Sequence, residues 1–137
     1  MKSYFIDTNI IMYAYGNNHK YKESCIRILR FVALNEIFGI VNVEVFQEII
    51  YRYASIGKKT EGIEIAKNIL KIAQATEPVE KEDIQIALDV FEKYNSLGAR
   101  DALHLATMIK TGLRYIISAD KHFDKIKEIQ RIDPLEF

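Results

Sequence analysis

The chain has 137 residues, close to the commonest domain size, so we expect a single domain over residues 1–137. Its 19 Lys and Arg residues balance 19 Asp and Glu residues, and zero net charge argues against a protein that binds polyanions through many basic side chains. The single cysteine, Cys25, excludes an intrachain disulfide, and no run approaches the ~18 apolar residues of a membrane span, so a cytoplasmic protein without a membrane segment is expected.

The N-terminal half is predicted to begin with a short buried strand. The run Tyr4-Phe5-Ile6 joins aromatic and β-branched residues without polar alternation, which is typical of a strand in a parallel sheet. Asp7 ends this run, and the next residues can cap a helix. The elements expected after it are, in order, helix 9–15, helix 19–34, strand 39–42, helix 43–56 and helix 58–74.

The C-terminal half continues the alternation. Pro78 lies in a weak strand at 76–79, which places that strand at the edge of a sheet. The elements expected after it are helix 81–94, helix 99–111, strand 115–118, a helical turn within 119–127 and strand 130–133. Strands that alternate with helices indicate an α/β domain with a central parallel sheet.

Apolar spacing also predicts the buried face of three of these helices. For the helix 43–56 the expected core residues are Val45, Phe46, Ile49, Ile50 and Tyr53. For the helix 58–74 they are Ile63, Ala66, Ile69, Leu70 and Ala73, and for the helix 81–94 they are Ile84, Ala87, Leu88 and Phe91.

Four acidic residues are predicted to meet at one edge of this sheet. Asp7 and Asp120 each follow a strand, and Asp101 lies in the first turn of the helix that leads into the 115–118 strand. Glu48 lies in the second turn of the helix that leaves the 39–42 strand, and we prefer it to Glu44 because its neighbours are core residues. All these positions fall near the carboxyl ends of parallel strands, where ligands bind in open α/β sheets. Taken singly, each acid could instead be a helix cap or a turn residue.

A cluster of carboxylates points to a hard cation. Such groups repel one another, and without metal at least one of them should have a raised pKa. Mg²⁺ or Mn²⁺ prefers carboxylate and water oxygens, whereas no Cys and His set has the spacing of a zinc site. We interpret His104 and His122, which lie close to Asp101 and Asp120, as packed or solvated histidines.

Five segments carry a family resemblance over nearly the whole chain: Phe5-Ile6-Asp7-Thr8-Asn9-Ile10, Val43-Glu44-Val45-Phe46-Gln47-Glu48, Arg100-Asp101-Ala102-Leu103-His104-Leu105-Ala106, Ile117-Ser118-Ala119-Asp120-Lys121-His122-Phe123-Asp124 and Ile132-Asp133-Pro134. With these segments the sequence resembles the PIN-domain nucleases, which include the VapC-type toxins of prokaryotes. The resemblance implies a three-layer α/β/α sandwich and an acidic Mg²⁺ or Mn²⁺ site that cleaves RNA. It places the family's acids on Asp7, Glu48, Asp101 and Asp120.

The resemblance also implies supporting residues and partners. Asp124 is a less certain fifth acid, and the polar supports would be Thr8, Asn9 and Ser118. An antitoxin protein would be a partner, and a homodimer is expected because two-fold dimers are the commonest soluble oligomers. We would place the dimer interface on the helical segments 20–34 and 58–74, of which the second matches no motif of the family.

The predicted reaction is metal-assisted hydrolysis of an RNA phosphodiester. Asp7, Asp101 and Asp120 would hold one ion or two, and Glu48 would complete the site or act through a bound water. Arg100 and Lys121 are candidates to bind the substrate.

Two other interpretations remain open at the level of the sequence. One is a non-catalytic PIN-like binding module in RNA processing or protein association. The other makes Asp7 a phosphatase nucleophile that forms an aspartyl-phosphate. Phosphatases of this kind resemble an Asp-x-Asp pattern, but this chain has Asn9 at the second position, and an amide is a poor general acid.

Overall fold

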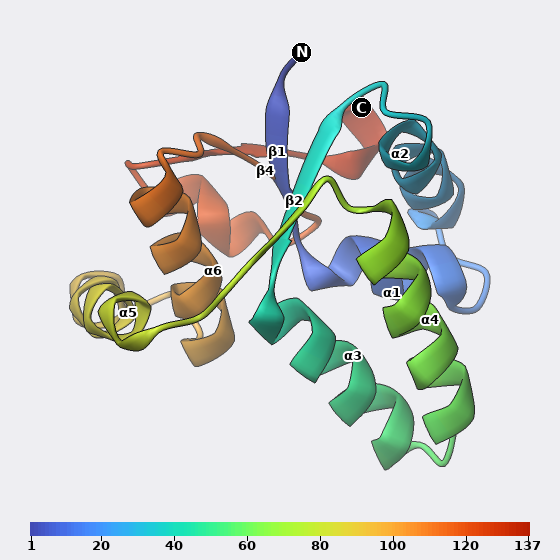
Figure 1. Ribbon diagram of the computed structural model, residues 1–137. Coiled ribbons are helices and arrows are strands. Elements are labelled where there is room, and N and C mark those ends of the chain that lie inside the picture. The colour runs from blue at the N-terminus through green and yellow to red at the C-terminus, as the bar shows by residue number, and fades with distance from the viewer.

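The structure is a computed structural model that describes all residues 1–137. Its centre is a five-stranded sheet with the strand order β3-β2-β1-β4-β5, and every neighbouring pair is parallel (Figure 1). The strands are β1 (Ser3–Ile6), β2 (Phe38–Asn42), β3 (Ala75–Glu77), β4 (Tyr115–Ile117) and β5 (Gln130–Ile132). The predicted parallel sheet and the edge position of the strand before Pro78 are therefore confirmed.

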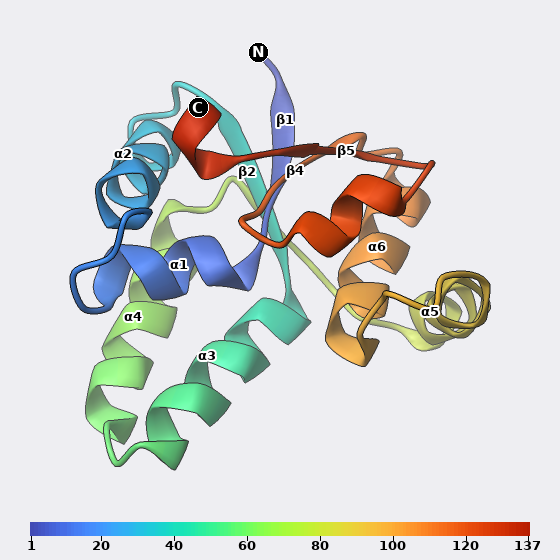
Figure 2. The same cartoon turned by 180° about the vertical axis from the view of Figure 1, so that it is seen from behind.

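Six α-helices and two 3-10 turns complete the chain. They are α1 (Thr8–Tyr15), α2 (Lys22–Ala33), α3 (Val43–Ser55), α4 (Lys59–Ile72), α5 (Lys81–Lys93), α6 (Ala99–Thr111), η1 (Lys121–Lys125) and η2 (Pro134–Glu136). Helices α1 to α4 cover one face of the sheet, and α5 and α6 cover the other (Figures 1 and 2). The fold is thus the three-layer α/β/α sandwich that the sequence indicates.

The middle of the sheet is its most buried part. β1 pairs with β2 on one side and with β4 on the other, so that Phe5 lies beside Ile40 and Ile116. The side chains of Phe5 and Ile116 have no exposed surface, and Ile6 and Ile117 are buried as well. A strand covered on both faces needs apolar residues at every position, which explains the absence of alternation in these runs.

Local signals in the sequence set where the helices begin and end. The side chain of Asp7 accepts a hydrogen bond from the Thr8 backbone N–H at the start of α1, and the side chain of Asn42 does the same for Val45 in α3. Gly57, which follows α3, has a φ of 76°, a left-handed conformation that glycine adopts without steric cost. The helix predicted to begin at residue 19 begins instead at Lys22.

The buried face of α5 differs from the predicted one. Asp83, Ala87 and Val90 are buried there, whereas Ile84, Leu88 and Phe91 are exposed. α5 packs on α6, and Asp83 can be buried on this side because its carboxylate pairs with Lys110 of α6 at 3.2 Å and accepts the Glu80 backbone N–H. Apolar spacing takes account only of the large apolar side chains, so it cannot predict that an ion pair will bury Asp83.

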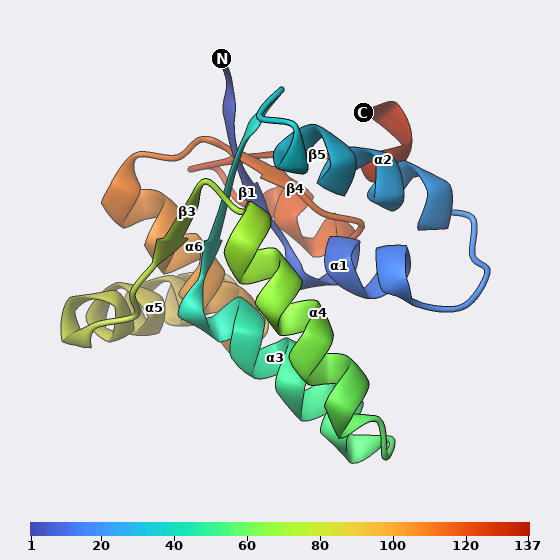
Figure 3. The same cartoon turned by 45° about the vertical axis from the view of Figure 1, so that its right-hand side comes forward.

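A smaller correction of the same kind applies to α3 and α4. Ile50 and Leu70, which the spacing predicts in the core, are exposed, whereas Ile65 of α4, which it does not predict there, is buried. The two helices lie side by side and project away from the sheet (Figure 3). Gly62 of α4 makes this packing close, because a Cβ atom at this position would lie 2.6 Å from Cβ of Tyr53 in α3. No helix of the structure has both the length and the apolar character needed to cross a bilayer.

Candidate active site

An acidic cleft of about 580 Å³ opens at the carboxyl edge of the sheet. The four acids predicted from the sequence all line it, although they come from four different parts of the chain. The lining residues are Asp7, Thr8, Asn9, Met12, Tyr13, Glu48, Arg52, Gly98, Ala99, Arg100, Asp101 and Asp120. The cleft forms here because parallel strands bring their carboxyl ends to one edge, and α1, α3 and α6 all begin at that edge.

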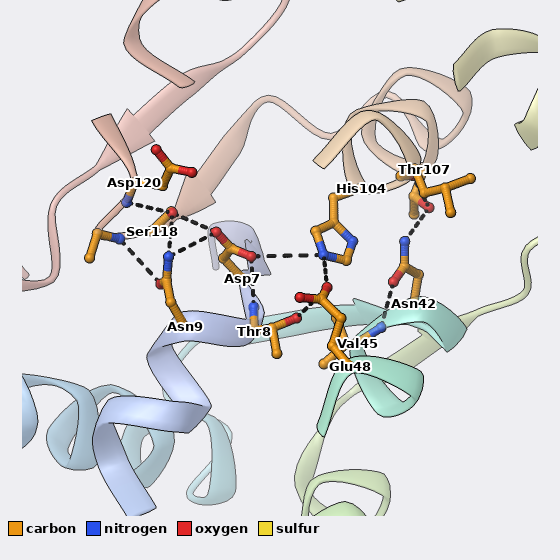
Figure 4. A network of polar contacts seen from close by, with 12 residues as sticks. Asp7, Thr8, Asn9, Asn42, Val45, Glu48, His104, Thr107, Ser118 and Asp120 are labelled. Atoms are coloured by element: carbon orange, nitrogen blue, oxygen red, sulfur yellow. Dashed lines mark hydrogen bonds and ion pairs between the residues drawn. The ribbon is translucent and has the colours of Figure 1, made fainter. Parts of the chain in front are cut away.

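Asp7 lies deepest in this group and is held on both oxygens. Its residue is 4% exposed. One carboxylate oxygen accepts the Thr8 backbone N–H at 2.7 Å, and the other accepts the Ser118 hydroxyl at 2.6 Å and the Asn9 side-chain amide at 3.1 Å (Figure 4). Burial raises the pKa of Asp7 above its usual value, although His104 and these hydrogen bonds act in the opposite direction.

Ser118 and Asn9 also fix the loop that carries Asp120. The Asp120 backbone N–H donates to the Ser118 hydroxyl oxygen at 3.0 Å, and the Ala119 backbone N–H donates to the Asn9 side-chain oxygen at 3.3 Å. Asn9 and Ser118, two of the three residues expected as polar supports, therefore tie the end of β4 to the end of β1 (Figure 4).

Asp101 faces the same cleft from the first turn of α6. Burial and the nearby charge of Asp7 raise its pKa to about 7, and Asp120 and Glu48 act in the same direction. A raised pKa in this cluster agrees with the mutual repulsion that the sequence predicts.

Glu48 is the acid of α3 that reaches the cleft. Its Oε1 accepts the Thr8 hydroxyl at 3.0 Å and lies 2.8 Å from Nε2 of His104. Burial alone would raise the pKa of Glu48, but the hydrogen bond and the charge of His104, together with Thr8, bring it below the usual value. Glu44, the competing acid one turn earlier, does not line the cleft.

Two of the candidate residues lie elsewhere. Asp124 faces Arg131, with N–O distances of 2.8 and 3.2 Å, and this hydrogen-bonded pair lowers the pKa of the carboxylate. Lys121 is exposed and does not line the cleft, whereas Arg100 does, with its guanidinium 5.4 Å from the centre of the Tyr51 ring. Both residues belong to η1, the turn that follows Asp120, and neither of them lines the cleft.

Sequence reasoning missed the contribution of His104. The residue is packed, as we interpreted it, but it is packed against the acids: its Nε2 lies 3.8 Å from Oδ1 of Asp7 as well as 2.8 Å from Glu48. The signal that could have revealed it is its spacing, because a residue three positions after Asp101 lies on the same face of a helix. His122, in contrast, is solvated, with its Nδ1 2.9 Å from Oδ1 of Asp120.

The donor set fits a hard divalent cation. Ligand atoms of Asp7, Asp101 and His104 lie within 4.8 Å of one another, and Glu48 and Asp120 line the same cleft. Carboxylates held together at raised pKa gain from a cation that neutralises them, and oxygen ligands are those that Mg²⁺ and Mn²⁺ prefer. Asp7, Asp101 and Asp120 could hold such an ion.

Comparisons with known proteins agree with this geometry. A family model described as PIN domain matches residues 4–129. The VapC ribonuclease Mb1869c of Mycobacterium bovis is 34% identical over 128 residues, which cover 93% of this chain and 97% of that protein. Ribonuclease VapC13 of Mycobacterium tuberculosis matches with the same identity and coverage.

Solved structures with low sequence identity share the fold. The VapBC2 structure from Rickettsia felis, bound to a DNA fragment from its promoter, matches with a TM-score of 0.74 at 17% identity and covers 95% of this chain and 97% of that chain. Mycobacterium tuberculosis VapC20, described as a sarcin-ricin loop cleaving toxin, matches with a TM-score of 0.73 at 14% identity, covering 91% of this chain and 95% of that chain.

Proposed function

The chain belongs to the PIN-domain family, and from this premise we propose that it is an endoribonuclease that hydrolyses RNA phosphodiester bonds with Mg²⁺ or Mn²⁺ as its cofactor. The observation that carries the proposal is the convergence of Asp7, Glu48, Asp101 and Asp120 on one open cleft. The 34% identical relatives are named as ribonucleases, which supports the same reaction.

Each acid has a separate part in the proposed reaction. Asp7, Asp101 and Asp120 would hold the cation, which when bound supplies charge neutralisation for the phosphate and acidifies water. Glu48 keeps its Oε1 in hydrogen bonds with Thr8 and His104, and its other oxygen is available to orient the attacking water and accept a proton from it. The hydrogen bonds of Ser118 and Asn9 keep Asp7 and Asp120 at a fixed position relative to each other during this step.

The rim of the cleft supplies contacts for the RNA strand. Arg52 and Arg100 line it, and their charges would bind phosphates on either side of the bond that is cut. Met12 and Tyr13 also line the cleft and offer surfaces on which an unpaired base could pack. We therefore propose single-stranded RNA as the substrate and assign Arg100, rather than Lys121, to its binding.

The reaction is tested with the purified chain and labelled single-stranded RNA of mixed sequence. We expect cleavage with Mg²⁺ or Mn²⁺, loss of cleavage with a chelator, and its return when Mn²⁺ is added in excess. The control is Asp124→Asn, which removes an acid outside the cleft and should leave cleavage unchanged.

Two outcomes would contradict this proposal. Cleavage that persists in chelator, or that requires zinc, would show that the oxygen-ligand site does not carry the reaction. If the protein cleaves none of a set of RNA pools in either metal but still binds RNA or a protein partner, the alternative of a non-catalytic PIN-like binding module would hold instead.

We also propose that the chain acts in the cytoplasm as the toxin of a toxin–antitoxin pair, with a small antitoxin protein as its partner. The structures that share its fold include a toxin-antitoxin complex from Klebsiella pneumoniae and a member of the VapBC family of toxin-antitoxin systems from Mycobacterium tuberculosis. A gene for a small DNA-binding protein beside the gene for this chain would support the pairing, and growth inhibition that this neighbour relieves would test it.

Self-association as a two-fold dimer is a further part of the proposal. Leu34 and Leu70 are the large exposed apolar residues of the two segments where we placed the interface. α5 carries a more continuous exposed row, formed by Ile84, Leu88 and Phe91. Sedimentation equilibrium at tens of micromolar protein should show a dimer, and a monomer at every concentration would refute it.

A further inference from the structure

His104 is a polar side chain in the middle of the core. It lies one turn after Asp101 in α6, has no exposed surface, and packs against Phe5 of β1 with the ring centres 5.0 Å apart. A buried imidazole loses its hydration, so its place in a fold is explained by the partners it gains. Its partner here is Glu48, which belongs to the proposed active site (Figure 4).

The two contacts of Glu48 fall on the same oxygen. Oε1 accepts the Thr8 hydroxyl at 3.0 Å and lies 2.8 Å from Nε2 of His104. A carboxylate can only accept, so Nε2 must carry the hydrogen of this bond. The carboxylate is thereby fixed in orientation while its second oxygen is left without a protein donor.

This hydrogen bond also argues against His104 as a metal ligand through Nε2. A nitrogen that ligates a metal uses its lone pair, and an Nε2 that carries a hydrogen has none to offer. The other nitrogen, Nδ1, is buried and has no hydrogen-bond partner in the protein. His104 therefore belongs to the residues that act on Glu48 and not to the cation ligands.

A second contact keeps the two helices at the right distance for this bond. Asn42 caps α3 through its side-chain oxygen, which accepts the Val45 backbone N–H at 3.2 Å. Its amide nitrogen donates to the hydroxyl of Thr107 at 2.9 Å, and Thr107 lies one turn after His104 in α6 (Figure 4). The start of α3 is thus joined to α6 beside the Glu48–His104 pair.

From these contacts we propose that His104 is a positioning residue of the ribonuclease site, which holds Oε1 of Glu48 so that the other carboxylate oxygen faces the cleft. The inference rests on the proposed function, because Glu48 matters only if the cleft is an active site. Partners of this kind, when removed, typically reduce activity or metal affinity by about 10- to 100-fold.

Two amide variants test the role with matched chemistry. The amide nitrogen of Gln reaches about as far as Nε2 of histidine, whereas the amide nitrogen of Asn reaches only about as far as Nδ1. We expect His104→Gln to keep most of the wild-type kcat for RNA cleavage and His104→Asn to lose about 10- to 100-fold, with little change in KM. Thr8→Val, which removes the other donor to the same oxygen, should also lower kcat.

A double-variant cycle asks whether His104 acts through Glu48. Glu48→Ala removes the acceptor, so adding His104→Asn to it should cause little further loss of kcat. A full additional loss would show that His104 acts independently of Glu48 and would overturn the inference, as would equal kcat values for His104→Gln and His104→Asn. A Mn²⁺-induced rise in melting temperature that disappears in His104→Gln would instead identify His104 as a ligand.

One measurement needs no activity. Nitrogen NMR of the wild-type imidazole should show hydrogen on Nε2 that exchanges slowly, and Glu48→Ala should make the exchange fast. An Nε2 without hydrogen in the wild-type protein would refute the inference. Because this readout does not depend on cleavage, it separates a failure of the His104 assignment from a failure of the proposed ribonuclease function.

Discussion

Replacement of Asp7 by Asn is expected to abolish RNA cleavage and to remove most of the stabilisation that Mn²⁺ gives to the wild-type protein. Asp7 is the most buried of the four acids, and both of its oxygens are already oriented by hydrogen bonds. A cation that binds only the folded state adds about 2.7 kcal/mol at a hundredfold excess over its Kd. For a domain of this size that is a rise in Tm on the order of 5–10 °C.

The metal-free Asp7→Asn protein should melt close to the wild type. Asn keeps the shape of Asp and an oxygen for the Thr8 backbone N–H, but the amide nitrogen that replaces Oδ2 cannot accept the hydrogen bonds from Ser118 and Asn9. Against this loss, it removes a buried negative charge whose pKa is raised by burial. Thermal melting with and without Mn²⁺ measures both effects, with Asp124→Asn as the control that should keep the full metal-induced rise. Equal rises in wild type and Asp7→Asn, together with retained cleavage, would remove Asp7 from the site.

The metal-induced rise should also shrink as the pH is lowered. Asp101 has a pKa of about 7 in the folded protein, and the pKa of Asp7 is raised as well. Between the usual carboxylate range and pH 7 the metal-free folded state therefore binds protons that the unfolded chain has released, and its stability falls as the pH rises through this window. A cation must displace those protons. Melting curves at pH 8, 7 and 6 should thus show a decreasing Mn²⁺ effect, and a constant effect would contradict it.

Gly62→Val is expected to destabilise the protein by about 1–3 kcal/mol, the usual cost of inserting atoms into a close-packed contact. Glycine in a helix interior is normally a weakness, so valine would stabilise α4 if nothing opposed it. What opposes it is Tyr53, whose Cβ lies 2.6 Å from where the new Cβ would be. Chemical or thermal denaturation measures the change.

Lys67→Val is the matched control for this substitution, because it places the same side chain on an exposed position of α4. It should leave the stability nearly unchanged, and a similar loss in both variants would refute the packing explanation. The result also bears on the segment that matches no family motif. α4 supports α3, which carries Glu48 and Arg52 into the cleft, so Gly62→Val should reduce cleavage by the protein that remains folded.

The acids of the cleft could be predicted because their positions depend on chain topology. Asp7 directly follows β1 and Asp120 lies three residues after the end of β4, and the carboxyl ends of parallel strands lie at the same edge of the sheet. Glu48 could be chosen over Glu44 because it is flanked by core residues, and the structure brings only Glu48 to the cleft. These inferences need no side-chain packing.

What the sequence could not provide depends on packing between distant elements. The burial of Asp83 depends on its ion pair with Lys110. The orientation of α5 that buries Asp83 and exposes Leu88 depends on the same pair. The importance of His104 depends on Glu48, which is 56 positions away in the chain. In each case a polar residue is placed by a partner that local spacing does not identify.

The central position of β1 has a consequence for the timing of protein synthesis. Residues 3–6 leave the ribosome before the other elements of the domain, but one side of this strand stays unpaired until residues 115–117 have been made. Asp7 likewise waits for Ser118, its hydrogen-bond partner 111 positions later. At about 5–20 residues per second this interval lasts on the order of ten seconds. A nascent chain therefore cannot assemble its acidic cleft beside the ribosome that is making it until residues 115–120 have been made.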